Sequence, residues 1–219
     1  MAYDYGPPAR PIEETLAAIQ AGLAREYRAE YLPAHRRSPR RTRRLRRIRG
    51  WSRETGRLIS GAGRVVRETL PRIERDTGHT FPGPDGLLRV LMDPSTKRLF
   101  FGILAGFPEE ALPVPAHDLA RLGAFPDDSR ALALIGDVTL RLKVLSGPEA
   151  EVRDLAALSD RWDLHESLIG LLCRRRPAGE TLLWEKETLA RAVLGLIYVE
   201  GGADALRRAV PLLVPGPAG

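Results

Sequence analysis

The sequence has one cysteine and no long hydrophobic run, and both absences narrow the class of protein. Cys173 has no partner in the 219-residue chain, which excludes an internal disulfide and favours a reducing compartment. No apolar stretch approaches the roughly 18 residues that a bilayer-spanning helix requires. The N-terminal residues also lack the basic and then apolar pattern of a secretion signal. We therefore expect a soluble, cytoplasmic protein that does not enter a membrane.

Acidic residues are scarce in the first part of the chain. Residues 1–80 hold 18 arginines and 9 acids, a net charge of +9, whereas residues 81–219 have a net charge of −3; the sum is the +6 of the whole chain. Within residues 36–49 there is no acid at all. This arginine block consists of Arg36, Arg37, Arg40, Arg41, Arg43, Arg44, Arg46, Arg47 and Arg49. Such a block repels itself unless a polyanion neutralises it.

Alternating apolar and polar residues, typical of strands, are also missing, and most apolar residues follow helical spacing instead. The sequence therefore predicts an all-α fold. A basic N-terminal extension over 1–77 is expected to contain a helix over 11–31, the arginine block over 36–49 and a second helix over about 57–75. The sequence leaves open whether residues 34–64 are ordered without a partner.

The arginine block is the candidate nucleic-acid-binding site. Arginines that neutralise phosphates release counterions and bind without sequence preference. Trp51, which follows the block, is a candidate stacking surface for a base. The alternative is a solvated arm that contacts an acidic protein.

Three segments in order resemble the catalytic domain of the ribonuclease III family. HTFPGPDGLLRVLMDPS (79–95) is similar to the opening motif of that family, and SRALALIGDVTL (129–140) to its central signature. ETLARAVLGLIYVEGGADALRRAV (187–210) is similar to its last signature helix. The resemblance implies a ribonuclease III-like helical domain over 78–212, with an insertion over 97–128, that forms a homodimer. No double-stranded RNA-binding domain is expected after it.

The family hydrolyses double-stranded RNA with magnesium, which requires several converging carboxylates. In this chain the resemblance places only Asp137 at an acidic position. The other three acidic positions of the family correspond to Ala133, Thr188 and Arg191. An earlier Glu of the central signature corresponds to Arg130. We therefore expect a catalytically degenerate domain with no metal site and no cofactor.

Other acids leave an active enzyme open as an alternative. Asp127, Asp128, Glu185 and Glu187 are near the lost positions in sequence and would have to converge on Asp137. Glu187 is one residue out of register and so points about 100° away around its helix. In that case Mg²⁺ or Mn²⁺ would be the cofactor.

Two pairs of glycines have predicted structural roles. Gly136 and Gly195 permit close contact between helices, while Gly201 and Gly202 can adopt the positive φ that ends one helix and begins another.

Three hypotheses of function result. The first is a catalytically inactive ribonuclease III-like protein that binds structured or double-stranded RNA, in RNA processing or with the ribosome. The second is a divergent metal-dependent endoribonuclease. The third is a protein-interaction adaptor with a basic arm.

Overall fold

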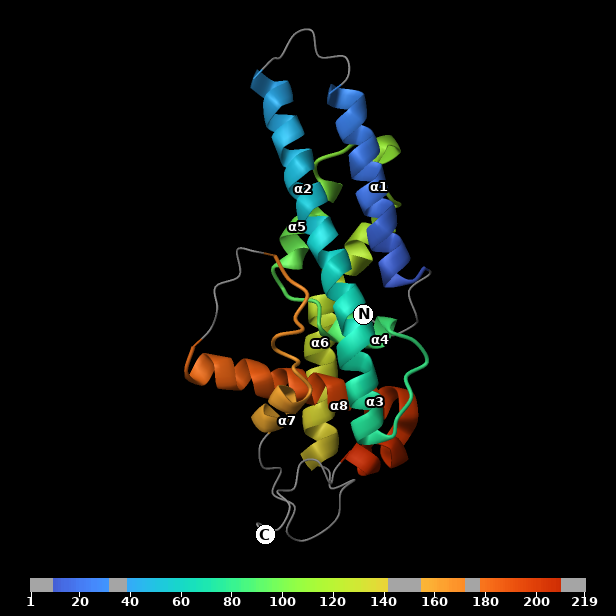
Figure 1. The fold of residues 1–219 in the computed structure, drawn as a ribbon, viewed down its shortest axis with the longest axis vertical. Coiled ribbons are helices and arrows are strands. Elements are labelled where there is room, and N and C mark those ends of the chain that lie inside the picture. Colours follow the sequence, from blue (N-terminus) through green and yellow to red (C-terminus); the bar gives the residue numbers. More distant parts are fainter. Residues whose placement is uncertain (1–9, 32–38, 142–154, 172–177, 210–219) are drawn as a thin grey trace. The chain divides into compact units, whose positions relative to one another are not determined.

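The computed structural model of the chain consists of helices and connecting segments (Figure 1). It describes residues 10–31, 39–141, 155–171 and 178–209, and for residues 39–41 the backbone alone. The α-helices are α1 (Ile12–Tyr31), α2 (Pro39–Arg64), α3 (Leu70–Thr77), α4 (Asp85–Val90), α5 (Thr96–Leu104), α6 (Ala116–Arg141), α7 (Leu155–Arg161) and α8 (Glu180–Ala209). A π-helical turn, η1 (Val65–Thr69), and a 3-10 turn, η2 (Glu109–Ala111), complete the list.

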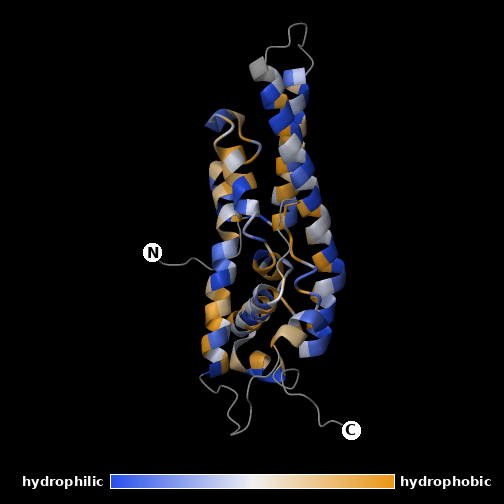
Figure 2. Cartoon of the chain, turned by 90° about the vertical axis from the view of Figure 1, so that its left-hand side faces the viewer, coloured by the Kyte–Doolittle hydropathy of each residue, from blue (hydrophilic) through white to orange (hydrophobic). Residues whose placement is uncertain are grey.

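The predicted all-α class is confirmed. The described residues form no strand, and their single isolated bridge pairs Met92 with Ile169. Each helix carries both apolar and polar residues (Figure 2). In the described part of the chain, no helix combines the length and apolarity that crossing a membrane would require.

Backbone packing divides the chain into two compact units. Unit 1 comprises residues 1–63, 93–124 and 170–174, and unit 2 comprises 64–92, 125–169 and 175–219. This division groups residues 93–124 with the N-terminal helices, whereas the sequence predicts an insertion over 97–128 within the second domain. The domains predicted over 1–77 and 78–212 stay a prediction.

Helices α1 and α2 supply much of the core of unit 1. Ile12, Leu16, Ile19 and Leu23 recur every three or four residues along α1 and are fully buried. In α2, Ile48 and Leu58 are fully buried as well. The sequence leaves open whether residues 34–64 are ordered without a partner. Within this range, residues 39–64 have an α-helical backbone. Apolar spacing thus orients both helices despite the many arginines of α2.

The helix predicted over about 57–75 falls on the end of α2, on η1 and on α3. The π turn Val65–Thr69 ends directly before the first turn of α3, which contains Pro71. Proline has no N–H to donate, so a continuous α-helix would lose a hydrogen bond there. The π-helical turn η1 at this point lets the chain continue from α2 into α3 as a helix. Gly78, with φ of 63°, ends α3.

In unit 2, α6 and α8 cross at two glycines, as predicted. A Cβ on Gly136 would overlap the carbonyl oxygen of Arg191, and a Cβ on Gly195 would overlap that of Leu132. Further along α8, Gly202 has φ of 68° and ψ of −167° and interrupts the helix. The positive φ predicted for the glycine pair is therefore present at Gly202. Gly201 is required for a different reason, because a Cβ there would overlap Ala205 and lie 2.8 Å from the His79 ring.

Replacing Gly195 by alanine should destabilise unit 2. Alanine has the higher helix propensity by about 1 kcal/mol, but its methyl group would overlap backbone atoms of α6, which cannot move like a side-chain end. Overpacking typically costs about 1–3 kcal/mol, so the thermal midpoint followed by circular dichroism should fall by several degrees.

Gly50→Ala is the matched control. Gly50 lies in α2, and a Cβ there would meet nothing within 4 Å. Because helix propensity alone then acts, this variant should be as stable as the parent or slightly more so. Equal melting of both variants would show that the α6–α8 crossing does not need glycine.

Candidate nucleic-acid interface

Helix α2 has a buried side and an arginine side. At 100° per residue, Arg43, Arg46 and Arg53 share one side of the helix, and they are exposed. Ile48 and Thr55 lie on the opposite side and are fully buried. Burial of one side therefore directs the arginines of the other side toward solvent.

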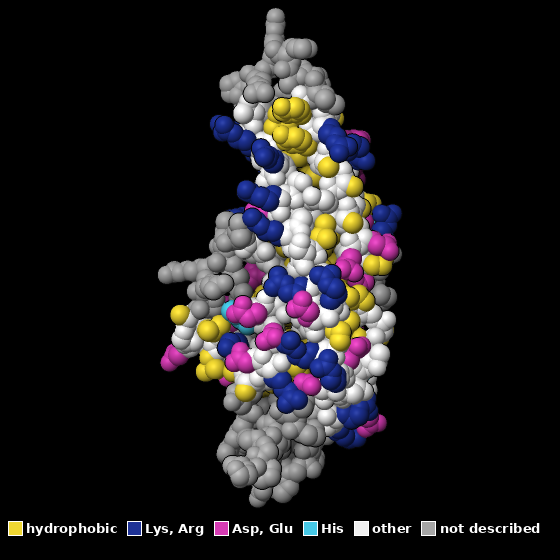
Figure 3. Space-filling view, viewed as in Figure 1, with side chains coloured by type: hydrophobic (Ala, Val, Ile, Leu, Met, Phe, Trp, Pro, Cys, Tyr) yellow, Lys and Arg dark blue, Asp and Glu magenta, His cyan; other side chains and the backbone are white. Residues whose placement is uncertain are grey.

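Most of these arginines have no acidic partner. In the described part of the chain, Arg43, Arg46, Arg47 and Arg49 are exposed and form no ion pair with a carboxylate. Arg44 differs, because it lies 3.4 Å from Glu30 and stacks over the Phe107 ring at 5.6 Å. Figure 3 shows dark blue side chains with little magenta along α2, whereas blue and magenta alternate over the helices of unit 2.

The structure describes part of the predicted arginine block. Arg36 and Arg37 lie outside the described residues, and for Arg40 and Arg41 only the backbone within α2 is described. Beyond the block, exposed Arg53 lies on the same side of α2 and enlarges the basic surface. The sequence contained a signal for it, since Arg53 follows Arg46 by seven residues, which is two helical turns.

Trp51 packs within unit 1. Its ring centroid lies 5.8 Å from that of Phe107, and a Cβ on Gly106 would overlap the indole. A Cβ on Gly102 would lie 3.4 Å from the Trp51 Nε1. The indole therefore fills a notch left by two glycines, and its predicted role in stacking on a base stays a prediction.

Asp137, the residual acid of the resembled family, is already neutralised by cations. Its Oδ1 lies 3.4 Å from Nε of Arg191 on α8, and its Oδ2 lies 2.9 Å from Nε of Arg141 on α6. Arg191 also donates a hydrogen bond of 2.9 Å to Glu187 Oε2. A metal ion at Asp137 would meet the positive charge of two guanidinium groups, which opposes its binding.

The other residues that the resemblance places at acidic positions are buried or have a local partner. Ala133 is buried, with 8% of its surface exposed. The Thr188 hydroxyl donates to the carbonyl of Trp184 at 2.8 Å, and Arg130 lies 3.5 Å from Asp127. Of the residues singled out, the fold brings together Asp137, Arg191 and Glu187 across the α6–α8 crossing.

Of the four acids proposed to restore a metal site, Glu187 shares Arg191 with Asp137, and the other three have partners elsewhere. Asp127 pairs with Arg130, Asp128 lies 3.9 Å from Arg89, and Glu185 lies 3.5 Å from His165 Nε2. Among the described residues, no group of three or more His, Cys, Asp or Glu side chains is arranged to hold a metal ion.

Sequence reasoning missed a polar pair in unit 2, in which His79 is buried and the Glu200 side chain is largely covered. His79 Nε2 lies 3.7 Å from Glu200 Oε2, and the two side chains are 8% and 19% exposed. Burial lowers the pKa of His79, with a further decrease from Arg208 and an opposing effect of Glu74. Burial also raises the pKa of Glu200 to about 7, against the opposing effect of Arg89. One indication of this pair is present in the sequence, because Glu200 directly precedes Gly201 and Gly202.

Glycines make room for this pair. A Cβ on Gly86 would lie 2.6 Å from Glu200 Oε1, and one on Gly201 would lie 2.9 Å from His79 Nδ1. Nearby, the buried Arg89 stacks over the Phe125 ring at 5.4 Å. The carboxyl and the imidazole are thus held away from water, which disfavours the charged form of each.

Stability should depend on pH through Glu200. The folded state holds the Glu200 proton up to about pH 7, whereas an unfolded chain releases it near 4.5. The folded state binds more protons in this window, so the Glu200 contribution to stability is present below pH 4.5 and is lost as pH rises to 7. Glu200→Gln should remove this loss, so the variant gains stability relative to the parent between pH 5 and pH 8 in urea unfolding.

His79 acts in the opposite direction, because its lowered pKa means that its contribution is lost as pH falls below 6.5. The Glu200→Gln variant should therefore show stability that rises with pH toward 6.5. Glu68→Gln, at an exposed position in η1, is the control and should keep the pH profile of the parent. Identical profiles for all three proteins would contradict the assigned pKa shift of Glu200.

No known protein family, curated protein or solved structure matches the chain. The resemblance to the ribonuclease III family therefore stays a prediction that rests on the three motifs and their order.

Proposed function

We propose that the chain is a ribonuclease III-like protein that binds structured or double-stranded RNA and has no nuclease activity. The observation that carries the proposal is the row of exposed arginines on α2 without acidic partners. The expected setting is RNA processing or the ribosome in the cytoplasm.

The arrangement of α2 suits a phosphate backbone. Arg43 and Arg53 are ten residues apart, which corresponds to about 15 Å along a helix. A guanidinium group is a planar donor that can form paired hydrogen bonds with phosphate oxygens. Because the contacts would be to phosphates, binding should depend steeply on salt and little on sequence. Duplex RNA is generally recognised by such shape and backbone contacts.

The surroundings of Asp137 support the absence of nuclease chemistry. Metal-assisted hydrolysis needs a divalent ion that activates water and stabilises the leaving oxygen. Here two arginines share the carboxylate that would have to hold the ion.

The proposal includes a homodimer, as the resemblance implies. Large apolar side chains are exposed on the two helices that bear the family signatures. They are Leu134 and Val138 on α6, and Leu183 and Trp184 on α8, where Trp184 is 63% exposed. Exposed apolar side chains of this size are common at protein interfaces.

The triple variant Arg43→Gln, Arg46→Gln, Arg53→Gln tests the arginine surface. Substitution is preferable to deletion because buried Ile48 lies in the same segment. If each arginine contacts one phosphate, the slope of log K against log salt should decrease by about 2–3. The measurement is duplex RNA binding by fluorescence anisotropy between 50 and 300 mM KCl.

The matched control changes the same charge elsewhere. Arg67, Arg75 and Arg98 are exposed, and replacing all three by Gln also removes three positive charges. This control should retain most of the affinity and the salt slope. Equal losses in both variants would mean that net charge, and not the α2 surface, determines binding. No binding by the parent would favour the adaptor hypothesis.

Asp137→Asn tests the loss of catalysis. We expect neither the parent nor the variant to cut duplex RNA with Mg²⁺ or Mn²⁺, and both to bind it equally. Removing this partly exposed ion-pair partner should cost less than about 1 kcal/mol of unfolding free energy. The measurement is denaturing electrophoresis of labelled RNA, beside a binding assay. Cleavage by the parent that disappears in the variant would establish the divergent nuclease instead.

A further inference from the structure

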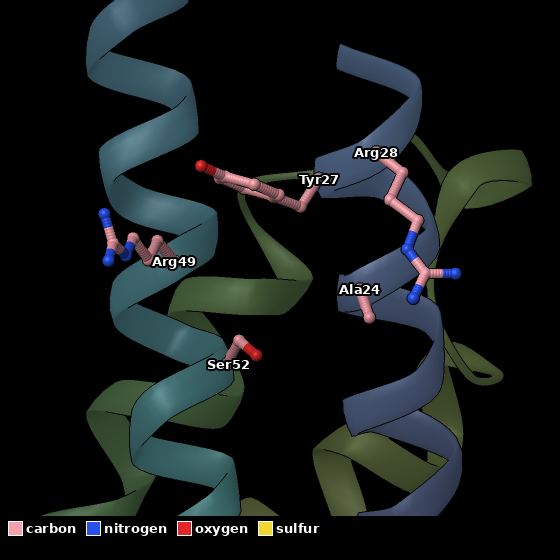
Figure 4. Close-up of a pocket in the computed structure, with 5 residues that line it drawn as sticks. All are labelled: Ala24, Tyr27, Arg28, Arg49 and Ser52. Carbon is pink, nitrogen blue, oxygen red and sulfur yellow. The ribbon is translucent and has the colours of Figure 1, made fainter. Parts of the chain in front are cut away.

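A pocket between α1 and α2 of unit 1 lies beside the arginine surface. It has a volume of about 340 Å³ and is lined by Ala24, Tyr27 and Arg28 of α1 and by Arg49 and Ser52 of α2. Its size is at the lower end of the range for small-ligand sites. In Figure 4 the Tyr27 side chain reaches from α1 toward α2, with Ala24 and Ser52 on one side of its ring.

Tyr27 offers one face of an aromatic stack to this pocket. Its ring is stacked with that of Tyr31, with centroids 5.7 Å apart and an angle of 12° between the planes. Tyr31 lies one helical turn toward the end of α1, and Ala24 lies about one turn in the other direction. Tyr31 thus stacks with an offset against Tyr27 on the side away from Ala24, and Ala24 on the other side lines the pocket together with Tyr27. A flat ring placed there would continue the stack.

A polar group with unused hydrogen-bonding capacity lines the same pocket. Ser52 Oγ accepts a hydrogen bond of 3.1 Å from Gln20 Nε2, so its own hydrogen is left to donate. A hydroxyl group that can donate matches an acceptor on the edge of a nucleobase better than an aliphatic group.

Two cations border the pocket, one on each helix. Arg28 and Arg49 point away from the Tyr27 ring in Figure 4, and neither forms an ion pair within the described residues. Guanidinium groups on both sides of an aromatic stack suit a ligand that joins a flat ring to a phosphate. An acidic peptide would use the arginines but not the stack.

We propose that this pocket binds a single unpaired nucleotide of the RNA, with its base stacked on Tyr27 and its flanking phosphates at Arg28 and Arg49. This inference rests on the proposed function and deepens it. The α2 surface holds the duplex without sequence preference, and the pocket selects RNA that carries a bulged or flipped-out nucleotide.

The test compares two hairpin RNAs that differ by one bulged 2-aminopurine nucleotide. The parent protein should bind the bulged hairpin about 5- to 100-fold more tightly than the fully paired hairpin, as expected for one base stacked on an aromatic ring. Tyr27→Leu should abolish this preference and the accompanying change in 2-aminopurine fluorescence, while keeping the affinity for the paired hairpin within about twofold. Tyr27→Phe keeps the ring and should behave like the parent.

Two further variants separate the pocket from the arginine surface. Arg28→Gln should weaken binding of the bulged hairpin more than that of the paired one. The triple α2 variant keeps Arg49 and should weaken both hairpins by a similar factor, so that their ratio is retained. Circular dichroism melting shows whether Tyr27→Leu is folded, and Arg28→Gln provides the same test if it is not.

Binding of the two hairpins distinguishes failure of the pocket assignment from failure of the proposed function. Equal binding of both hairpins by the parent overturns the pocket assignment and leaves duplex binding intact. No binding of either hairpin overturns both. Adenosine monophosphate is titrated in parallel, and its binding without any preference for the bulged hairpin would overturn the assignment to RNA in favour of a free nucleotide.

Discussion

The close approach of α6 and α8 is the constraint on which unit 2 depends. At Gly136 and Gly195 each helix lies against a carbonyl group of the other, a separation that no side chain larger than hydrogen permits. This contact also places Asp137 within reach of Arg191. The crossing therefore joins the two helices by an ion pair as well as by backbone contact, with Arg191 shared between Asp137 and Glu187.

Helical periodicity and glycine spacing predicted much of the fold. The apolar row of α1, the close helix contact at Gly136 and at Gly195 and the positive φ at Gly202 were predicted from the sequence, whereas the fold shows that the first two glycines meet each other. The loss of acidic positions at Ala133 and Thr188 stays a prediction that rests on the resemblance.

Contacts between distant segments were beyond sequence reasoning. His79 and Glu200 are 121 residues apart, so only the tertiary fold reveals that their side chains lie 3.7 Å from each other. Similarly, Trp51 follows the arginines directly in sequence, which suggested an exposed stacking surface, whereas its ring packs against Gly102 and Gly106. The pocket beside Tyr27 arises from two helices whose spacing no local pattern specifies.

The packing of the Trp51 ring also determines how α2 is rotated about its own axis. A helix with a broad buried side can turn by some tens of degrees and still bury its aliphatic residues, but a bulky indole fits the notch at Gly102 and Gly106 at one rotation. The direction in which Arg43, Arg46 and Arg53 point is thus fixed by the packing of Trp51 within unit 1. Two uncharged glycines on another segment of the chain therefore determine how the arginine side of α2 is oriented.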